Sequence, residues 1–415
     1  MNRILLENCA LLDPRDGELK DGHNVFVESG VIRAVSERPI PANADIVMNV
    51  AGRTLMPGLI DLHVHVTATQ FNVPAQVSMP NVFVTLRTIP IMQGMLQRGF
   101  TSVRDASGAE FALAEAVESG LVDGPRLFVS GHALSQTGGH GDLRMRSDFL
   151  APSDTCACGF RVGTFTRVVD GVDAVRKAVR EELQMGAHQI KIMASGGVAS
   201  PTDPVDALGY SLDEIRAAVD EAEARNTYVM AHAYTPAAIK RAVQCGVRTI
   251  EHGNLVDHEA AAVMRTHGAY AVPTLVTYNA LIDEGARLGL LPSSVEKAKY
   301  VRDAGLNSLQ ILKEAGVKIG FGTDLLGESH RLQSDEFRIR AEVLSSREII
   351  ASATTIAAEI LNMEGKLGVI EPGAIADMLV VDGNPLRDLS CLLGQGERLD
   401  LIMKGGKLYK NRISQ

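Results

Sequence analysis

The sequence predicts an α/β protein, a (β/α)8 TIM barrel with a small flanking β-sandwich domain built from both termini. Three observations support this fold class. Strand-like and helix-like segments alternate between residues 58 and 362, the candidate strands number eight, and both ends of the chain carry only short strands. Eight strands that alternate with helices over roughly 250 residues or more are typical of such a barrel.

The first 57 residues contain short strand-like runs that need a partner. Residues 24–27 and 31–35 flank Ser29-Gly30, which has the composition of a tight hairpin turn. The other end of the chain carries a buried-type strand and a second hairpin around Gly405-Gly406. Because neither end is long enough to bury a core alone, we expect one composite β domain from residues 1–57 and 363–415.

The barrel is expected over residues 58–362, where short apolar runs alternate with amphipathic segments. The candidate strands are residues 59–65, 101–106, 126–131, 189–195, 228–234, 249–254, 269–274 and 318–324. The candidate helices are residues 82–98, 109–119, 172–185, 212–225, 236–244, 258–266 and 294–315. Ser211 and Glu214 form a capping box at the start of one of these helices.

Two long insertions interrupt this rhythm, residues 133–170 and residues 275–292. Loops of this length in a compact domain more often bind or cover a ligand than merely connect two elements. Both insertions leave from the carboxyl ends of candidate strands, where barrel enzymes build their sites.

Composition narrows the class of protein and partner. The chain has 415 residues, 46% of them hydrophobic, and a net charge of -9. A negative chain without a long basic run argues against nucleic acid and against an acidic membrane surface, so we expect a small-molecule substrate. The sequence shows no apolar run of eighteen residues and no signal segment, and its five cysteines are scattered, which favours a reducing, cytoplasmic location.

The strand at residues 59–65 ends in His63 and His65, which alternate and therefore share a face. Two imidazoles on one face supply half of a tetrahedral metal site, although two hydrogen-bonded strand histidines are the simpler alternative. The ends of later candidate strands add more metal-binding side chains: Lys191, His232, His252 and Asp324. Taken singly, His232 is more often a hydrogen-bonded core histidine, and Asp324 has the place of a turn or cap residue.

Lys191 lies within an apolar strand that a barrel buries on both faces. Burial disfavours the ammonium and shifts the lysine toward a neutral, nucleophilic amine. Reaction of that amine with carbon dioxide gives an anionic carbamate that can bridge two metal ions. A lysine paired with a barrel aspartate and a Schiff-base lysine are the alternatives.

The order His-x-His, Lys, His, His, Asp on strands one, four, five, six and eight resembles the binuclear form of the amidohydrolase superfamily. Several local motifs are similar to its imidazolonepropionase-related branch: residues 56–61, 103–105, 195–197, 251–253 and 322–324. That branch includes dipeptidases that act on Xaa-Pro and on Xaa-Arg or Xaa-Lys. The mononuclear imidazolonepropionases and deaminases lack the bridging lysine, so Lys191 argues against both.

The resemblance implies two divalent metal ions, zinc by first expectation, and N6-carboxylation of Lys191. His63, His65 and Asp324 would hold the more buried ion, and His232 and His252 the more exposed one. A metal-bridging hydroxide would attack the amide, with Asp324 as general base and acid. It also implies a homo-oligomer.

Two further residues are candidates for catalysis and for binding the substrate, Tyr234 and His140. Tyr234 follows His232 by two residues on one strand and faces the same interior, where a core tyrosine is the alternative role. His140 lies in a glycine-rich part of the first insertion, and Arg144 and Arg146 follow it as candidate carboxylate ligands.

The predicted activity is hydrolysis of a dipeptide amide bond, with Xaa-Pro as the first expectation. The alternatives are an Xaa-Arg or Xaa-Lys dipeptidase and a hydrolase of another N-acyl amino acid or of a cyclic or aryl amide. A catalytically silent assembly scaffold is the alternative outside enzymes, and the complete ligand set speaks against it.

Overall fold

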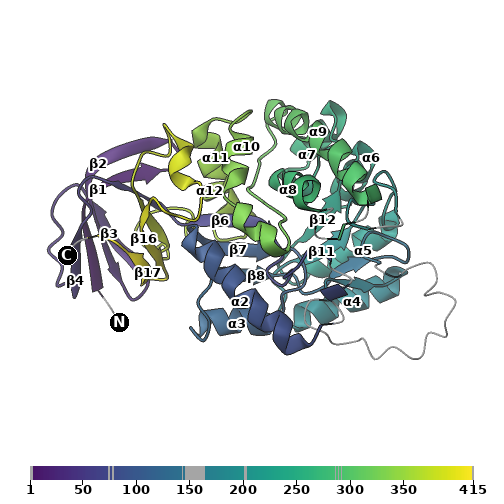
Figure 1. Ribbon diagram of the computed structural model, residues 1–415, viewed down its shortest axis with the longest axis horizontal. Helices are drawn as coiled ribbons and strands as arrows, with labels where there is room; N and C mark the ends of the chain where they lie inside the picture. The colour runs from purple at the N-terminus through teal and green to yellow at the C-terminus, as the bar shows by residue number, and fades with distance from the viewer. Residues whose placement is uncertain are drawn as a thin grey trace.

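Figure 1 shows two parts of the molecule side by side, a β-sheet at one end and a larger body of strands and helices. The computed structural model describes residues 3–72, 75–76, 79–142, 144, 164–200, 203–285, 287, 289–290 and 292–413. Both chain ends lie in the sheet, where purple strands of the N-terminal segment meet yellow strands of the C-terminal segment. The architecture is that of a TIM-barrel-type fold with a separate sheet.

The sheet contains eight strands from both ends of the chain, in the order β17-β16-β15-β5-β1-β2-β3 with β4 beside β1. Its strands are β1 (Arg3–Asp13), β2 (Glu18–Glu28), β3 (Val31–Ser36), β4 (Ile46–Asn49), β5 (Thr54–Pro57), β15 (Met378–Val381), β16 (Leu399–Lys404) and β17 (Lys407–Asn411). The antiparallel pair β5 and β15 joins the two ends, with Leu55 opposite Val380. The exact domain boundaries and a division into two sandwich layers stay predictions.

Both expected hairpins are present in this sheet. β2 and β3 are antiparallel, and the turn between them has positive φ angles at Ser29 (55°) and Gly30 (78°). Gly405 and Gly406, also at positive φ, connect β16 to β17. Positive φ at both central residues matches the twist of a two-residue hairpin, which explains why glycine-containing pairs stand there.

The barrel strands form two parallel groups, β6-β7-β8 and β10-β9-β11-β12-β13-β14. Their bounds are β6 (Leu59–Val64), β7 (Phe100–Asp105), β8 (Arg126–Val129), β9 (Ala133–Ser135), β10 (Thr166–Val168), β11 (Ile190–Met193), β12 (Val229–Ala233), β13 (Thr249–His252) and β14 (Tyr270–Val272). Seven of the eight expected strands are present within a few residues of their predicted bounds. The short strands β9 and β10 bracket the first insertion.

The eighth expected strand, residues 318–324, is an extended segment rather than a regular strand. Ile319 forms an isolated bridge with Ala271 of β14, and the amide of Leu62 in β6 donates to the carbonyl of Phe321 at 2.7 Å. The segment therefore contacts the strands on both of its sides. A continuous ladder around all eight positions is not recorded for the described residues, so closure of the barrel stays a prediction.

Helices cover the outside of the strands (Figure 1). They are α2 (Asn81–Gln97), α3 (Phe111–Glu118), α4 (Val172–Gln184), α5 (Leu212–Glu223), α6 (Pro236–Gln244), α7 (His258–Thr266), α8 (Val276–Glu284), α9 (Pro292–Glu314), α10 (Asp335–Arg340), α11 (Ser346–Ser352) and α12 (Thr355–Ile360). The predicted capping box of α5 is present, with the amide of Glu214 donating to Ser211. Helix α8 occupies the second insertion, and α10 to α12 were not predicted because each is only six or seven residues long.

The structure also bears on the cysteines and on the expectation of no membrane span. Within the described residues, Cys9, Cys245 and Cys391 are buried free thiols, whereas Cys156 and Cys158 lie outside them. The described part of the chain contains no helix long and apolar enough to cross a membrane.

Candidate metal centre and its cavity

A cavity of about 370 Å³ opens at the carboxyl ends of the barrel strands. Its wall includes all six side chains that the sequence singled out as metal ligands: His63, His65, Lys191, His232, His252 and Asp324. Apart from the neighbouring His63 and His65, these residues are far apart in the sequence, and the parallel strands bring their ends to one place.

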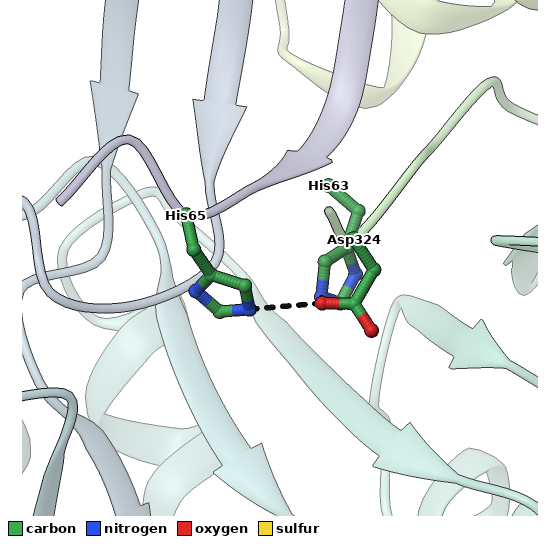
Figure 2. Close-up of side chains that lie close together, drawn as sticks. All are labelled: His63, His65 and Asp324. Carbon is green, nitrogen blue, oxygen red and sulfur yellow. Dashed lines mark ion pairs between the residues drawn. The ribbon is translucent and has the colours of Figure 1, made fainter. Parts of the chain in front are cut away.

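His63, His65 and Asp324 form the tightest group, with one ligand atom from each lying within 4.8 Å of the others. Figure 2 shows the two imidazoles turned toward the carboxylate. Nε2 of His65 lies 3.1 Å and Nε2 of His63 lies 3.5 Å from Oδ1 of Asp324. This spacing leaves the two ring nitrogens and the carboxylate oxygen around one point, as a shared metal ion requires.

The backbone around Asp324 is arranged to present its carboxylate. Gly322 packs closely against β6 and β14, since a Cβ there would lie 3.0 Å from Cβ of His63 and 2.7 Å from Val272. Asp324 itself has a positive φ of 55°, and its amide donates to the carbonyl of His63 at 2.8 Å. A left-handed aspartate is uncommon, and such backbone conformations concentrate at functional sites.

The protonated ring nitrogen is fixed for two of the four histidines by carbonyl acceptors. Nδ1 of His65 donates to the carbonyl of Ser107 at 3.0 Å, and Nε2 of His232 donates to the carbonyl of Gly196 at 3.0 Å. A carbonyl oxygen only accepts, so each of these nitrogens carries the proton. The opposite nitrogen, Nε2 of His65 and Nδ1 of His232, is therefore the one that would bind a metal ion.

His63 and His252 have equally defined partners. Nδ1 of His63 lies 2.7 Å from Oε2 of Glu251, whose carboxylate also accepts from Arg104. Nδ1 of His252 lies 2.8 Å from the hydroxyl of Thr274. Both hydrogen bonds orient their rings, and the carboxylate of Glu251, which only accepts, also places the proton of His63 on Nδ1.

Burial sets the charges of these groups. It lowers the pKa of His63, His232 and His252 well below the usual histidine value, so the three rings are neutral, the form that binds metal. Burial alone would raise the pKa of Asp324, but the neighbouring His63 and His65 outweigh it and lower that pKa. Burial would lower the pKa of His65, but its hydrogen bond to Asp324 and the charge of that carboxylate outweigh burial and raise that pKa. The aspartate is therefore an anion paired with His65 and beside a neutral His63.

Lys191 of β11 is buried, as its apolar strand predicts, with 2% of its surface exposed. Burial lowers its pKa to about 8, and the charge of Arg104 acts in the same direction. Glu251 and Asp324 oppose that shift. A lysine with this pKa has a substantial share of neutral amine near pH 7 to 8, the form that reacts with carbon dioxide.

The donor set suits divalent metal ions. Four imidazoles, each with one ring nitrogen hydrogen-bonded to a carbonyl, a carboxylate or a hydroxyl, together with one carboxylate and one buried lysine match the nitrogen and oxygen ligands of zinc, manganese, cobalt or iron. The residues present therefore fit a divalent metal site.

Tyr234 lies in the wall of the cavity, as predicted, with 3% of its surface exposed. Its hydroxyl is 2.9 Å from the hydroxyl of Tyr278, and its ring lies 5.4 Å from that of His252. Tyr278, on α8, was not singled out from the sequence, although it stands in the second insertion. The two hydroxyls together form a polar spot beside the histidines.

His140 also reaches the cavity from the first insertion. Its ring stacks on that of His232 with centroids 4.4 Å apart and planes 20° apart. Arg144 is placed differently, because its guanidinium donates twice to Asp142 at 2.7 Å and it does not belong to the described cavity wall. Arg146 lies outside the described residues.

The rest of the wall is largely apolar. Its apolar side chains come from several elements: Phe71, Phe165, Met193, Val198, Leu281, Leu290 and Leu326. Asp324 is the single carboxylate among the described wall residues. A cationic substrate side chain therefore finds no described acidic partner in the wall apart from the carboxylate of the metal centre.

Known proteins resemble this chain over most of its length. The profile of the Amidohydrolase family matches residues 54–408. Ochratoxinase of Aspergillus niger is 30% identical, over 98% of this chain and 87% of its own length.

Two solved structures are similar over nearly the whole chain. An amidohydrolase is 64% identical with a TM-score of 0.97, and the alignment covers 99% of this chain and 100% of that one. A prolidase complexed with N-methylphosphonate-L-proline is 56% identical with a TM-score of 0.95 and the same coverage. The chain therefore belongs to the amidohydrolase family and is a hydrolase that acts on amide C–N bonds.

Proposed function

We propose that this protein is a binuclear metal-dependent dipeptidase of the prolidase type, which cleaves Xaa-Pro dipeptides and N-acyl-L-proline. The main support is the 56% identity, over the full length of both chains, with a prolidase solved with a proline phosphonate. A Xaa-Pro dipeptidase solved with bound methionine is 28% identical over 99% of this chain, with a TM-score of 0.86.

The metal assignment is part of the same proposal. His63, His65 and Asp324 would hold one divalent ion, His232 and His252 a second, and Lys191, carboxylated on its amine, would bridge the two. Among the described residues, His63, His65 and Asp324 are the group whose ligand atoms lie within 4.8 Å of one another, which supports the first half of this assignment. The fixed tautomers of His65 and His232 support both halves, since each ring already has one nitrogen committed elsewhere. Zinc is the first expectation for the native metal.

When bound, the two ions would lower the pKa of a water held at the site and polarise the substrate carbonyl. Asp324 would accept the proton of that water on its carboxylate and pass it to the departing amide nitrogen. Its lowered pKa means that it starts the reaction as a base. Of the two bonded hydroxyls of Tyr234 and Tyr278, the one that does not donate to the other would donate to the substrate carbonyl, and the ring of His140 would hydrogen-bond the substrate carboxylate.

A neutral C-terminal residue fits this cavity better than arginine or lysine. A buried cation requires a paired charge, and the described wall offers no carboxylate besides Asp324. The apolar groups Phe71, Leu281 and Leu290 instead suit a proline ring or an aliphatic acyl group.

Hydrolysis of an aryl or cyclic amide is the second candidate function. It is supported by the 30% identity with ochratoxinase over 98% of this chain and by the apolar wall. The same metal ligands and the same proton transfer would serve it, so substrate choice alone separates the two candidates.

A substrate panel tests the proposal. Zinc-loaded protein would be assayed with L-Ala-L-Pro, N-acetyl-L-proline, L-Ala-L-Leu, L-Ala-L-Arg and an aryl amide of an amino acid. We expect kcat/KM to be highest for the two proline substrates and lowest for the arginine substrate. Faster cleavage of the arginine dipeptide or of the aryl amide would overturn the assignment as a prolidase and leave the amidohydrolase assignment standing.

A further inference from the structure

The ring of His140 is placed by contacts with other segments. His140 stands between β9 and the residues around Arg144, in a stretch without helix or strand. On one face its ring stacks on His232, 4.4 Å away. The edge of the ring contacts the loop that follows β11, residues 196–200 and 203–208 of which are described.

Two polar side chains of that loop hold the Nδ1 edge of the ring. Nδ1 of His140 lies 2.8 Å from the hydroxyl of Ser200 and 3.6 Å from Oδ2 of Asp203. Ser200 and Asp203 are 1% and 4% exposed, so water does not compete for these contacts. The same Oδ2 accepts the amide of Gly197 at 2.8 Å, which fixes the carboxylate in turn.

Gly197 makes room for the ring. A Cβ at this position would lie 2.0 Å from Cε1 and 2.2 Å from Nδ1 of His140. Real Cβ atoms do not approach other atoms this closely, so the imidazole sits directly on the backbone of the loop. The loop thus supplies both a flat backbone surface and a polar edge for one histidine.

Lys297 of α9 holds the loop in this shape. Its ammonium donates to three carbonyls of the loop, Gly197 at 3.1 Å, Ser200 at 3.0 Å and Asp203 at 2.6 Å. One cation that satisfies three carbonyls fixes their relative positions. Helix α9 is itself tied to the barrel, because Nδ2 of Asn254 donates to the carbonyl of Val301.

We propose that Asp203 is a positioning residue for His140. Together with Ser200, Asp203 fixes the imidazole of His140 and leaves Nε2 of that ring for the substrate. The ammonium of Lys297 in turn holds the loop that carries Ser200 and Asp203. The inference rests on the proposed function in one respect, namely that His140 contacts the substrate. It predicts that Asp203 and Lys297, neither of which is a candidate metal ligand, control the position of the substrate-binding ring of His140.

The first test compares Asp203→Asn with Asp206→Asn, an exposed aspartate of the same loop. With L-Ala-L-Pro as substrate, we expect kcat/KM to fall on the order of tenfold or more for Asp203→Asn and to stay unchanged for Asp206→Asn. In a His140→Ala background, Asp203→Asn should cause no further loss, because it acts through His140. Independent, additive losses in the double variant would overturn the proposal.

The second test does not depend on any substrate. Protein labelled with ¹³C at Cε1 of histidine would be studied by NMR, with the His140 signal identified by its loss in His140→Gln. Asp203→Asn should shift that signal, and Asp206→Asn should leave it in place. If no proline substrate is cleaved but the shift occurs, the positioning of His140 stands while the proposed function fails. An unchanged His140 signal in Asp203→Asn overturns the positioning role even if prolidase activity is found.

The role of Lys297 is tested by comparing Lys297→Met with Lys299→Met. Lys299 is a half-exposed lysine on the same helix and pairs with Glu296. We expect Lys297→Met to shift or broaden the His140 signal and to lower kcat/KM, with the metal content of the protein unchanged. Lys299→Met should do neither. Ser200→Ala serves as a milder variant if Asp203→Asn or Lys297→Met does not fold. A Lys297→Met protein with wild-type kcat/KM and an unshifted His140 signal would show that Lys297 does not hold the loop in place.

Discussion

Nδ1 of His63 lies 2.7 Å from a carboxylate oxygen of Glu251, and Arg104 donates to the same carboxylate at 2.8 and 3.0 Å. All three side chains are at most 1% exposed. A carboxylate that accepts from arginine also accepts the N–H of the histidine, so the proton of His63 stays on Nδ1. His63 then presents Nε2 toward Asp324 without any rearrangement.

Replacement of Glu251 by glutamine should weaken metal binding. The amide keeps the shape of the side chain but removes the charge that fixes the His63 tautomer and leaves Arg104 buried without its counter-ion. We expect metal affinity to fall by about 10- to 100-fold, measured by competition with a chelator. The free energy of unfolding should fall by about 3 to 5 kcal/mol in urea titrations. Glu259→Gln on the surface of α7 is the control, and unchanged metal affinity in Glu251→Gln would contradict this role.

Replacement of Lys191 by alanine should remove the proposed bridge. We expect the metal content to fall from two ions per chain to one or fewer, and amide hydrolysis to be lost. Elemental analysis of the purified protein after dialysis measures the content. Lys299→Ala, an exposed lysine, should keep both ions. Two tightly held ions in Lys191→Ala would show that the lysine does not bridge them.

Replacement of Tyr278 by phenylalanine should lower both the stability and the activity of the protein. The variant removes the hydroxyl that lies 2.9 Å from that of Tyr234 and leaves a buried polar group without this partner. We expect a loss of stability of about 1 kcal/mol. We also expect kcat/KM for L-Ala-L-Pro to fall about tenfold, equivalent to about 1.4 kcal/mol. Steady-state kinetics and thermal unfolding check both effects, with Tyr300→Phe on the exposed face of α9 as control.

His330 should make the fold sensitive to acid. It is 5% exposed, and burial, aided by the charge of Arg98, lowers its pKa to about 3. The unfolded chain therefore takes up this proton first, so stability is full above about pH 6.5 and is lost as pH falls toward 3. The loss reaches about 2 kcal/mol at pH 5.

In His330→Gln the stability should therefore change less between pH 7 and pH 5, because glutamine can donate to the carbonyl of Ala68 without titrating. Urea unfolding at several pH values measures the difference, and His258→Gln, an exposed histidine, is the control. An equally steep pH dependence in wild type and His330→Gln would contradict the assignment.

The sequence predicted that the six candidate ligand side chains lie together, because parallel barrel strands bring their ends to one place whatever the details of each strand. It did not assign a role to Glu251, although the residue stands beside His252. Neighbours on a strand face opposite sides, and Glu251 faces the interior with Thr249, whose hydroxyl donates to it at 2.5 Å. His252 reaches the same interior through its positive φ of 70° at the end of β13. The alternation of side chains along a regular strand does not predict that His252 turns to the same side as Glu251.

Other features escaped prediction because they depend on tertiary contacts. Asp203 and Lys297 are ordinary polar residues of a loop and a helix until α9 packs beside the loop after β11. Helix α11 did carry a readable signal, since Ser345 and Glu348 form a capping box. The segment around Gly320 and Gly322 has the apolar composition of a strand, but its glycines let it pack against β6 without a regular ladder.

Metal titration of chelator-treated protein tests the central claim most directly. Zinc would be added stepwise to the metal-free chain in the presence of bicarbonate, while hydrolysis of L-Ala-L-Pro and bound metal are followed together. The account predicts that activity rises to a plateau at two ions per chain, and that Lys191→Ala shows no such rise. Full activity at one ion per chain, or a fully metal-loaded protein that leaves every amide of the panel intact, would contradict it.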